Sequence, residues 1–95
     1  MGYVQILDFE TKHVKDVESL LSEWRRGTDG DRTVQHEIVA RDNNRPEHYV
    51  AILQFSLRDA AQRNEKLAES DRFADRMAEL CYGTVDFTYY EVIRD

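Results

Sequence analysis

The stretch that decides the fold is HYVAILQFSLRDAAQRN, residues 48–64. Residues 49–55 are apolar apart from Gln54, which is typical of a buried strand. Ser56 interrupts this run, and Asp59 follows three residues later, an arrangement close to a capping box. The stretch therefore predicts a buried strand that leads directly into a helix capped by Ser56. The inner side of that helix is marked by Leu57, Ala60, Ala61, Asn64 and Leu67.

The rest of the chain predicts further strands and helices on both sides of this stretch. Strands are expected at 3–9, 33–41, 48–55 and 84–93. Helices are expected from 14 to about 27, from 56 to a break near 69, and from a cap at Ser70 to Gly83. Loops are expected at 28–32 and 42–47. The order β-α-β-β-α-β predicts an α+β, ferredoxin-like domain covering residues 1–95, a four-stranded antiparallel sheet with its helices on one face.

Composition narrows the classes of partner. Thirteen basic residues stand against nineteen acidic ones, for a net charge of −6. This excess disfavours nucleic acid and anionic membranes as partners, because both require a positive surface. No apolar run reaches the length of a membrane span, and no signal-peptide core is present, so we expect a cytoplasmic protein. Cys81 is the only cysteine, which excludes an internal disulfide and favours a small buried side chain near a helix end.

The hairpin at 42–47 determines which side chains share a face of the sheet. A turn centred on its two asparagines would place His36 opposite Leu53, on the more apolar face, which should lie under the helices. That face would hold Val34, His36, Ile38, Ala40, Tyr49, Ala51, Leu53 and Phe55. An apolar band then remains on the opposite face, and such bands usually mark interfaces. We therefore expect a homodimer in which two sheets pack through the face that carries Val39, Val50 and Ile52.

One alternative with the same topology is the RNA-recognition module. RNA binding in that module needs aromatic rings on the open face of the sheet, where bases stack. Aligned through Phe55, this chain places Val50 and Ile52 at the stacking positions. Both are aliphatic and the chain is acidic, so RNA binding is not expected.

The whole chain resembles the dimeric α/β-barrel superfamily, and specifically antibiotic biosynthesis monooxygenase-like proteins. The segments that carry the resemblance are Tyr49-Val-Ala-Ile-Leu-Gln-Phe-Ser, Ala60-Ala61 with Arg63-Asn64, Phe73-Ala-Asp-Arg-Met-Ala-Glu-Leu-Cys81, and the aromatic last strand. The resemblance implies a homodimeric α/β barrel with a ligand cavity between sheet and helices in each subunit. Some members of that superfamily oxidise aromatic polyketides without metal or flavin, and others cleave haem.

Two departures from the characterised enzymes restrict what the resemblance implies. The cofactor-free oxygenases and the haem-degrading members use an asparagine on the first strand, where this chain offers only Gln5 as an amide. The haem-degrading members also take a histidine ligand from the second helical region, and residues 57–81 contain no histidine. We therefore expect neither haem nor any other bound cofactor.

Few residues remain for chemistry. His36, placed on the helix-facing side, would suit proton transfer, although a hydrogen-bonded core histidine has the same signature. Asn64 could polarise a substrate carbonyl, or it could be a helix-packing amide. An aromatic pocket would be lined by Trp24, Tyr49, Phe73 and Met77, which could equally be core residues. The remaining histidines, His13 and His48, lack the spacing of metal ligands, so no metal site is expected.

Two functions of different classes remain open. The first is a cofactor-independent, monooxygenase-like enzyme that acts on an aromatic or polyketide-like small molecule, with His36 and Asn64 as its catalytic residues. The second is a non-catalytic homodimeric module that binds a small ligand or serves in assembly. A cavity of roughly 300 Å³ or more would favour a ligand site over a filled core.

Overall fold

The computed structural model describes residues 2–27 and 34–95. Over these residues the elements follow the order β-α-β-β-α-α-β. Their bounds are β1 Tyr3–Glu10, α1 Val14–Gly27, β2 Val34–Arg41, β3 His48–Phe55, α2 Arg58–Glu65, α3 Ala68–Leu80 and β4 Tyr82–Glu91. The predicted loop at 28–32 lies outside the described residues. None of the helices found in the described ranges is long and apolar enough to cross a membrane.

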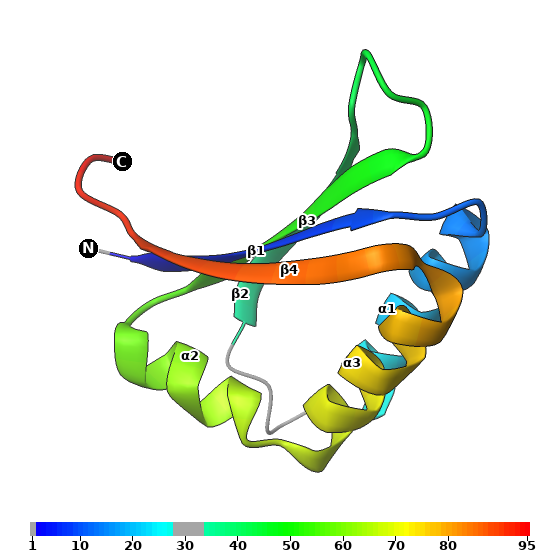
Figure 1. Ribbon diagram of the computed structural model, residues 1–95. Helices are drawn as coiled ribbons and strands as arrows, with labels where there is room; N and C mark the ends of the chain where they lie inside the picture. The colour runs from blue at the N-terminus through cyan, green and yellow to red at the C-terminus, as the bar shows by residue number, and fades with distance from the viewer. Residues whose placement is uncertain (1, 28–33) are drawn as a thin grey trace.

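The strands form a four-stranded sheet in the order β2-β3-β1-β4, and every neighbouring pair is antiparallel. Figure 1 shows α1, α2 and α3 together on one side of this sheet. This arrangement is the predicted ferredoxin-like α+β fold with helices on one face. The strand of the deciding stretch, β3, lies inside the sheet between β2 and β1.

The core lies between the sheet and the helices. α1 directs a stripe at helical spacing toward it, formed by Val17, Leu20, Leu21 and Trp24. β3 contributes alternate residues from the same side, and all of these are buried as predicted: Tyr49, Ala51, Leu53 and Phe55. Phe9 of β1 lies opposite Tyr49, and the two rings stack with 5.9 Å between their centroids. Burying a side chain of this size stabilises the fold by roughly 1.5–3 kcal/mol.

The predicted register of the β2–β3 hairpin is wrong by one residue along most of β2. Val34 does pair with Phe55, as expected, but His36 pairs with Gln54 because the register shifts between Val34 and His36. An extra residue in one strand reverses the face of every side chain beyond it. His36, Ile38 and Ala40 therefore lie on the face away from the helices. Glu37 and Val39 lie on the helix-facing side, so Val39 does not belong with Val50 and Ile52.

The helical region after β3 begins and breaks at positions other than those predicted. Ser56 does not cap α2, whose N-cap is Leu57 and has no side-chain capping bond. The break falls at Lys66 and Leu67, about three residues before the predicted one, and α3 begins at Ala68. Ser70 is consequently in the first turn of α3, where its hydroxyl is free to bond to another helix. Gly83 lies in β4, where its φ of +66° is a left-handed conformation that suits glycine.

The face of the sheet away from the helices, called the outer face below, carries a continuous apolar patch. Across the strands Ile38 pairs with Ile52, and Ile52 pairs with Ile6. The other apolar members of this patch are Val4, Val50 and Tyr90. Ile38 is 44% exposed and Tyr90 51% exposed, so the patch faces solvent in a single chain. The expected apolar band therefore exists, with Ile38 in place of Val39.

Candidate functional site

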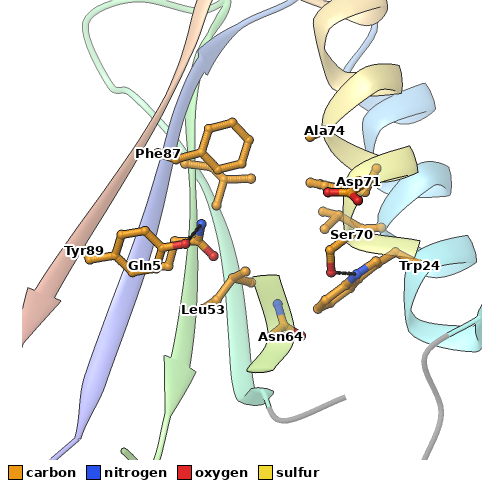
Figure 2. Close-up of a pocket in the computed structure, with 12 residues that line it drawn as sticks. Gln5, Trp24, Leu53, Asn64, Ser70, Asp71, Ala74, Phe87 and Tyr89 are labelled. Atoms are coloured by element: carbon orange, nitrogen blue, oxygen red, sulfur yellow. Dashed lines mark hydrogen bonds between the residues drawn. The ribbon is translucent and has the colours of Figure 1, made fainter. Parts of the chain in front are cut away.

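A cavity of about 250 Å³ opens between the helix-facing side of the sheet and all three helices. Figure 2 shows residues from β1, β3 and β4 on one side and from α1 and α3 on the other, with Asn64 of α2 between them. Its apolar wall consists of Leu7, Leu21, Leu53, Phe73, Ala74 and Phe87. Its polar groups come from Gln5, Trp24, Asn64, Ser70, Asp71 and Tyr89. An apolar pocket with a few convergent polar groups is the usual form of a small-molecule site.

Gln5 and Tyr89 form a polar pair on the sheet side of the cavity. Gln5 is 6% exposed, on the helix-facing side of β1, and its Nε2 donates to the Tyr89 hydroxyl at 3.0 Å. The two residues are direct cross-strand partners between β1 and β4. The Tyr89 ring also stacks on Tyr3, with 6.0 Å between the centroids. The orientation of this amide is therefore fixed by the neighbouring strand.

Trp24 and Ser70 form the second polar pair, on the helix side. The indole N–H of Trp24 donates to Ser70 Oγ at 3.2 Å, which joins α1 to the first turn of α3. The Trp24 ring is 6.0 Å from Phe73, centroid to centroid, at an interplanar angle of 47°. This tilted pair forms an aromatic wall whose one N–H donor is already bonded within the protein.

Asn64 differs from these pairs. The residue is 4% exposed, and its Oδ1 is buried without a hydrogen-bond partner among the described residues. A buried polar atom in this state costs about 1–3 kcal/mol relative to a bonded one. Because Asn64 lines the cavity, such a group indicates a position at which a ligand atom can complete the hydrogen bonding.

Among the described residues that line the cavity, Asp71 is the only acidic one, and none is Lys, Arg or His. Its side chain is exposed, in the first turn of α3. The polar surface of the cavity therefore consists of hydrogen-bonding neutral groups and a single carboxylate.

The predicted site residues fall into three groups. Asn64, Trp24 and Phe73 line the cavity. Met77 and Tyr49 are buried core residues, 0% and 6% exposed, and are not among its lining residues. His36 is exposed on the outer face, so its predicted position on the helix-facing side is wrong.

The sequence interpretation did not assign Gln5, Tyr89, Ser70 or Asp71 to the site. The sequence does contain a signal for Gln5 and Tyr89, because residues two positions apart on a strand share one face of the sheet. Gln5 lies two positions before the buried Leu7, and Tyr89 lies two positions after Phe87, which lines the cavity. Ser70 and Asp71 could not be found in this way, because the sequence predicts a helix cap at Ser70, whereas α3 begins at Ala68.

A second hollow of about 400 Å³ lies between α1 and β2. Most of its lining side chains are exposed, including Glu18, Ser22 and Arg26. It is thus a depression in the surface, and it lacks the aromatic walls of the first cavity.

A charged cluster lies at the hairpin end of the outer face. His48 bonds through Nδ1 to Asp42 at 2.8 Å and through Nε2 to Asp8 at 2.6 Å, and its side chain is only 12% exposed. These two carboxylates raise the pKa of His48, with Asp42 the larger cause. The backbone N–H of Asn44, followed by the His48 bond, lowers the pKa of Asp42 to about 2. Because both ring nitrogens of His48 face carboxylate oxygens, which accept hydrogen bonds, this arrangement favours the protonated form of the imidazole.

Two further groups near this end have raised pKa values. Loss of hydration, together with a bond from its hydroxyl to Glu47, raises the pKa of Tyr82 to about 12. Partial burial raises the pKa of the Cys81 thiol. Neither shift favours the reactive, ionised form of the group. The described residues contain no group of three or more His, Cys, Asp or Glu side chains arranged to hold a metal ion.

Comparison with known proteins gives structural likeness and no sequence match. No protein-family model matches the chain, and no curated protein does. SnoaB, a cofactor-independent oxygenase from Streptomyces nogalater, superposes with a TM-score of 0.80 at 14% identity, over 99% of this chain and 95% of its own. A protein from Deinococcus radiodurans, described as a candidate antibiotic biosynthesis monooxygenase, superposes with a TM-score of 0.77 at 16% identity, over 100% of this chain and 95% of its own. Rv0793 from Mycobacterium tuberculosis superposes with a TM-score of 0.79 at 12% identity, over 100% of this chain and 98% of its own.

These likenesses extend over nearly the whole of each chain. The fold of this protein is that of antibiotic biosynthesis monooxygenase-like proteins, as the resemblance in sequence predicted. At this level of identity the likeness establishes the fold, and activity has to be argued from the site itself.

Proposed function

We propose that this protein is a small-molecule oxygenase that acts on an aromatic or polyketide-like compound without a resident cofactor. The observation that carries the proposal is the buried Asn64 oxygen, without a partner among the described residues, in a cavity walled by aromatic and aliphatic side chains. The likeness to SnoaB, itself a cofactor-independent oxygenase, supports the reaction type by analogy of fold.

In a reaction of this kind the substrate supplies the electrons. A ring methylene loses two hydrogens to dioxygen, one oxygen atom becomes the new carbonyl, and the other leaves with both hydrogens as water. The role left for the protein is to hold the ring in one orientation and to exclude solvent. Asn64 would hydrogen-bond the oxygen substituent of the ring, and the Trp24–Phe73 wall would lie against its face.

Oxygen consumption with a panel of anthrones and of 1-naphthols, whose keto tautomers carry the ring methylene, tests this function. We expect uptake with at least one compound and a loss of about tenfold or more in Asn64→Ala, the loss of one well-placed hydrogen bond. His36→Ala should keep its activity, because His36 lies on the other face of the sheet. Full activity in Asn64→Ala would remove the role proposed for this amide.

The second candidate is a module that binds a small ligand without converting it. One observation favours it: the first strand offers Gln5 where the resemblance implies asparagine. The cavity of about 250 Å³ is slightly below the usual range for ligand sites, which favours either a small ligand or a role in assembly. Saturable binding with no oxygen uptake across the panel would select this function over the first.

For the assembly, we propose a homodimer through the outer face. Support comes from the apolar patch that includes Ile38, Val50 and Ile52, which water would cover in a lone chain. Two copies packed through this face would bury the patch and leave both cavities, on the opposite side of each sheet, open to ligand. A cytoplasmic location also stays a prediction.

A further inference from the structure

The donors and acceptors of the cavity are not equally available to a ligand. Gln5 Nε2 donates one hydrogen bond to the Tyr89 hydroxyl at 3.0 Å, and the indole N–H of Trp24 donates to Ser70 Oγ at 3.2 Å. The buried Oδ1 of Asn64, in contrast, accepts from nothing in the described part of the chain. The buried atom of the lining that lacks a partner among the described residues is therefore an acceptor, and a ligand with an O–H or N–H group can satisfy it.

The charge of the cavity points in the same direction. Asp71 contributes a carboxylate, and no basic residue is found among the described residues that line the wall. The N-terminus of α3 would by itself attract an anion. Its first turn, however, already carries Glu69 and Asp71. An entering carboxylate would meet negative charge, and no described lining residue offers a cation to pair with it, which in a partly desolvated site is unfavourable.

The size of the cavity limits the ligand further. An apolar cavity of about 150 Å³ is enough to hold benzene. The volume here, about 250 Å³, therefore suits a small ring compound with short substituents.

We propose that this cavity selects small ring compounds that donate a hydrogen bond to Asn64 and are uncharged or positively charged, and that it rejects the corresponding acids. Asn64 sets the requirement for a donor, and Asp71 sets the preference in charge. The inference rests on the cavity being the ligand site of the proposed function, but it does not depend on whether the bound ligand is oxidised.

The charge preference is tested with tyramine and 4-hydroxyphenylacetate, which share a phenol ring and carry opposite charges. Binding is measured by isothermal titration calorimetry on the full chain. We expect tyramine to bind more tightly by about tenfold or more, and Asp71→Asn to remove most of that difference. Asp16→Asn is the matched control, because Asp16 is also an exposed aspartate in the first turn of a helix but does not line the cavity. It should leave the ratio unchanged.

The requirement for a donor is tested with 2-naphthol and 2-methoxynaphthalene, which differ in one O–H group. The natural protein should bind the naphthol roughly tenfold more tightly than the methyl ether. Asn64→Leu should bind the two compounds equally. Asn64→Asp retains an acceptor and should keep the preference for naphthol. Loss of that preference in Asn64→Asp would mean that Asn64 acts as a donor, and would overturn its assigned role.

Equal binding of the amine and the acid, or tighter binding of the acid, overturns the inference, as does failure of all four compounds to bind. The result is separable from the proposed function. Selective binding without oxygen uptake would contradict the proposed oxygenase activity but support the ligand selectivity. Oxidation of an acidic substrate in this cavity would support the oxygenase activity but contradict the selectivity.

Discussion

Gln5 on β1 and Tyr89 on β4 lie directly opposite each other, and the Gln5 amide donates to the Tyr89 hydroxyl at 3.0 Å. The bond joins an interior strand to an edge strand at the surface of the cavity. It also fixes a polar side chain that is 6% exposed and that would otherwise disrupt an apolar wall. The shape of the proposed site thus depends on a pair whose members are 84 residues apart.

Breaking this pair should destabilise the protein measurably. In Tyr89→Phe the buried Gln5 N–H loses its acceptor, and we expect a loss of about 1–2 kcal/mol in the free energy of unfolding. Gln5→Leu with Tyr89→Phe should recover part of that loss, since neither polar group is then left unsatisfied. Urea denaturation of both single variants and the double variant gives the coupling energy, and a value near zero would show that the pair does not act as a unit.

Asn64 should show a trade between stability and binding. Its buried oxygen has no partner in the described part of the chain, which costs free energy in the empty protein, so Asn64→Leu should raise the stability of the free protein by about 1 kcal/mol. The same substitution should weaken the binding of ring compounds. Gln62→Leu is the control, since Gln62 is an exposed residue of the same helix and should give no such gain. A destabilised Asn64→Leu would indicate that this amide serves packing and not a ligand.

Much of the fold could be predicted because its elements are long and strongly patterned. The helix of Val17, Leu20 and Trp24, and the buried strand from Tyr49 to Phe55, lie where their periodicity places them. Strand β2 was harder, because Ile38, Val39 and Ala40 are consecutive apolar residues whose pattern fits either face. A one-residue shift in the pairing of β2 with β3, between Val34 and His36, determines which face each later side chain takes, and the composition of the strand does not indicate this shift.

The candidate site likewise combines residues that could be predicted from the sequence with contacts that could not. Asn64 and Trp24 could be predicted from helical spacing within single helices. The partner of Trp24, Ser70, could not be, because this contact joins α1 to α3 across 46 residues. The Gln5–Tyr89 pair likewise requires the order of strands, which places β4 beside β1. Contacts of this type depend on topology, whereas the residues themselves are visible in the sequence.

The His48 cluster predicts a specific dependence of stability on pH. The pKa of His48 is raised in the folded state, so its contribution is fully present below the ordinary value of 6.5 and is lost as the pH rises through the raised value. Asp42 acts in the opposite sense: with its pKa lowered from 3.8 to about 2, its contribution is present above 3.8 and is lost as the pH falls toward 2. The cluster should therefore be most stabilising between about pH 4 and 6.5.

Thermal denaturation across this range provides the measurement. In His48→Gln the fall in melting temperature above pH 6.5 should become shallower than in the natural protein. His13→Gln is the matched control, because the side chain of His13 is 62% exposed at the start of α1, with Asp16 at a distance of 3.9 Å. Identical pH profiles for the natural protein and His48→Gln would contradict a contribution from the cluster.

The position of the interface can be tested with two neighbouring residues of β2. Ile38 and Val39 are similarly exposed, at 44% and 37%, but lie on opposite faces of the sheet. If two copies pack through the outer face, Ile38→Lys places two charges in an apolar contact and should produce monomers. Val39→Lys introduces the same side chain on the helix-facing side and should leave the dimer intact. Light scattering at micromolar concentration distinguishes these outcomes, and the opposite pattern would favour the register first inferred from the sequence.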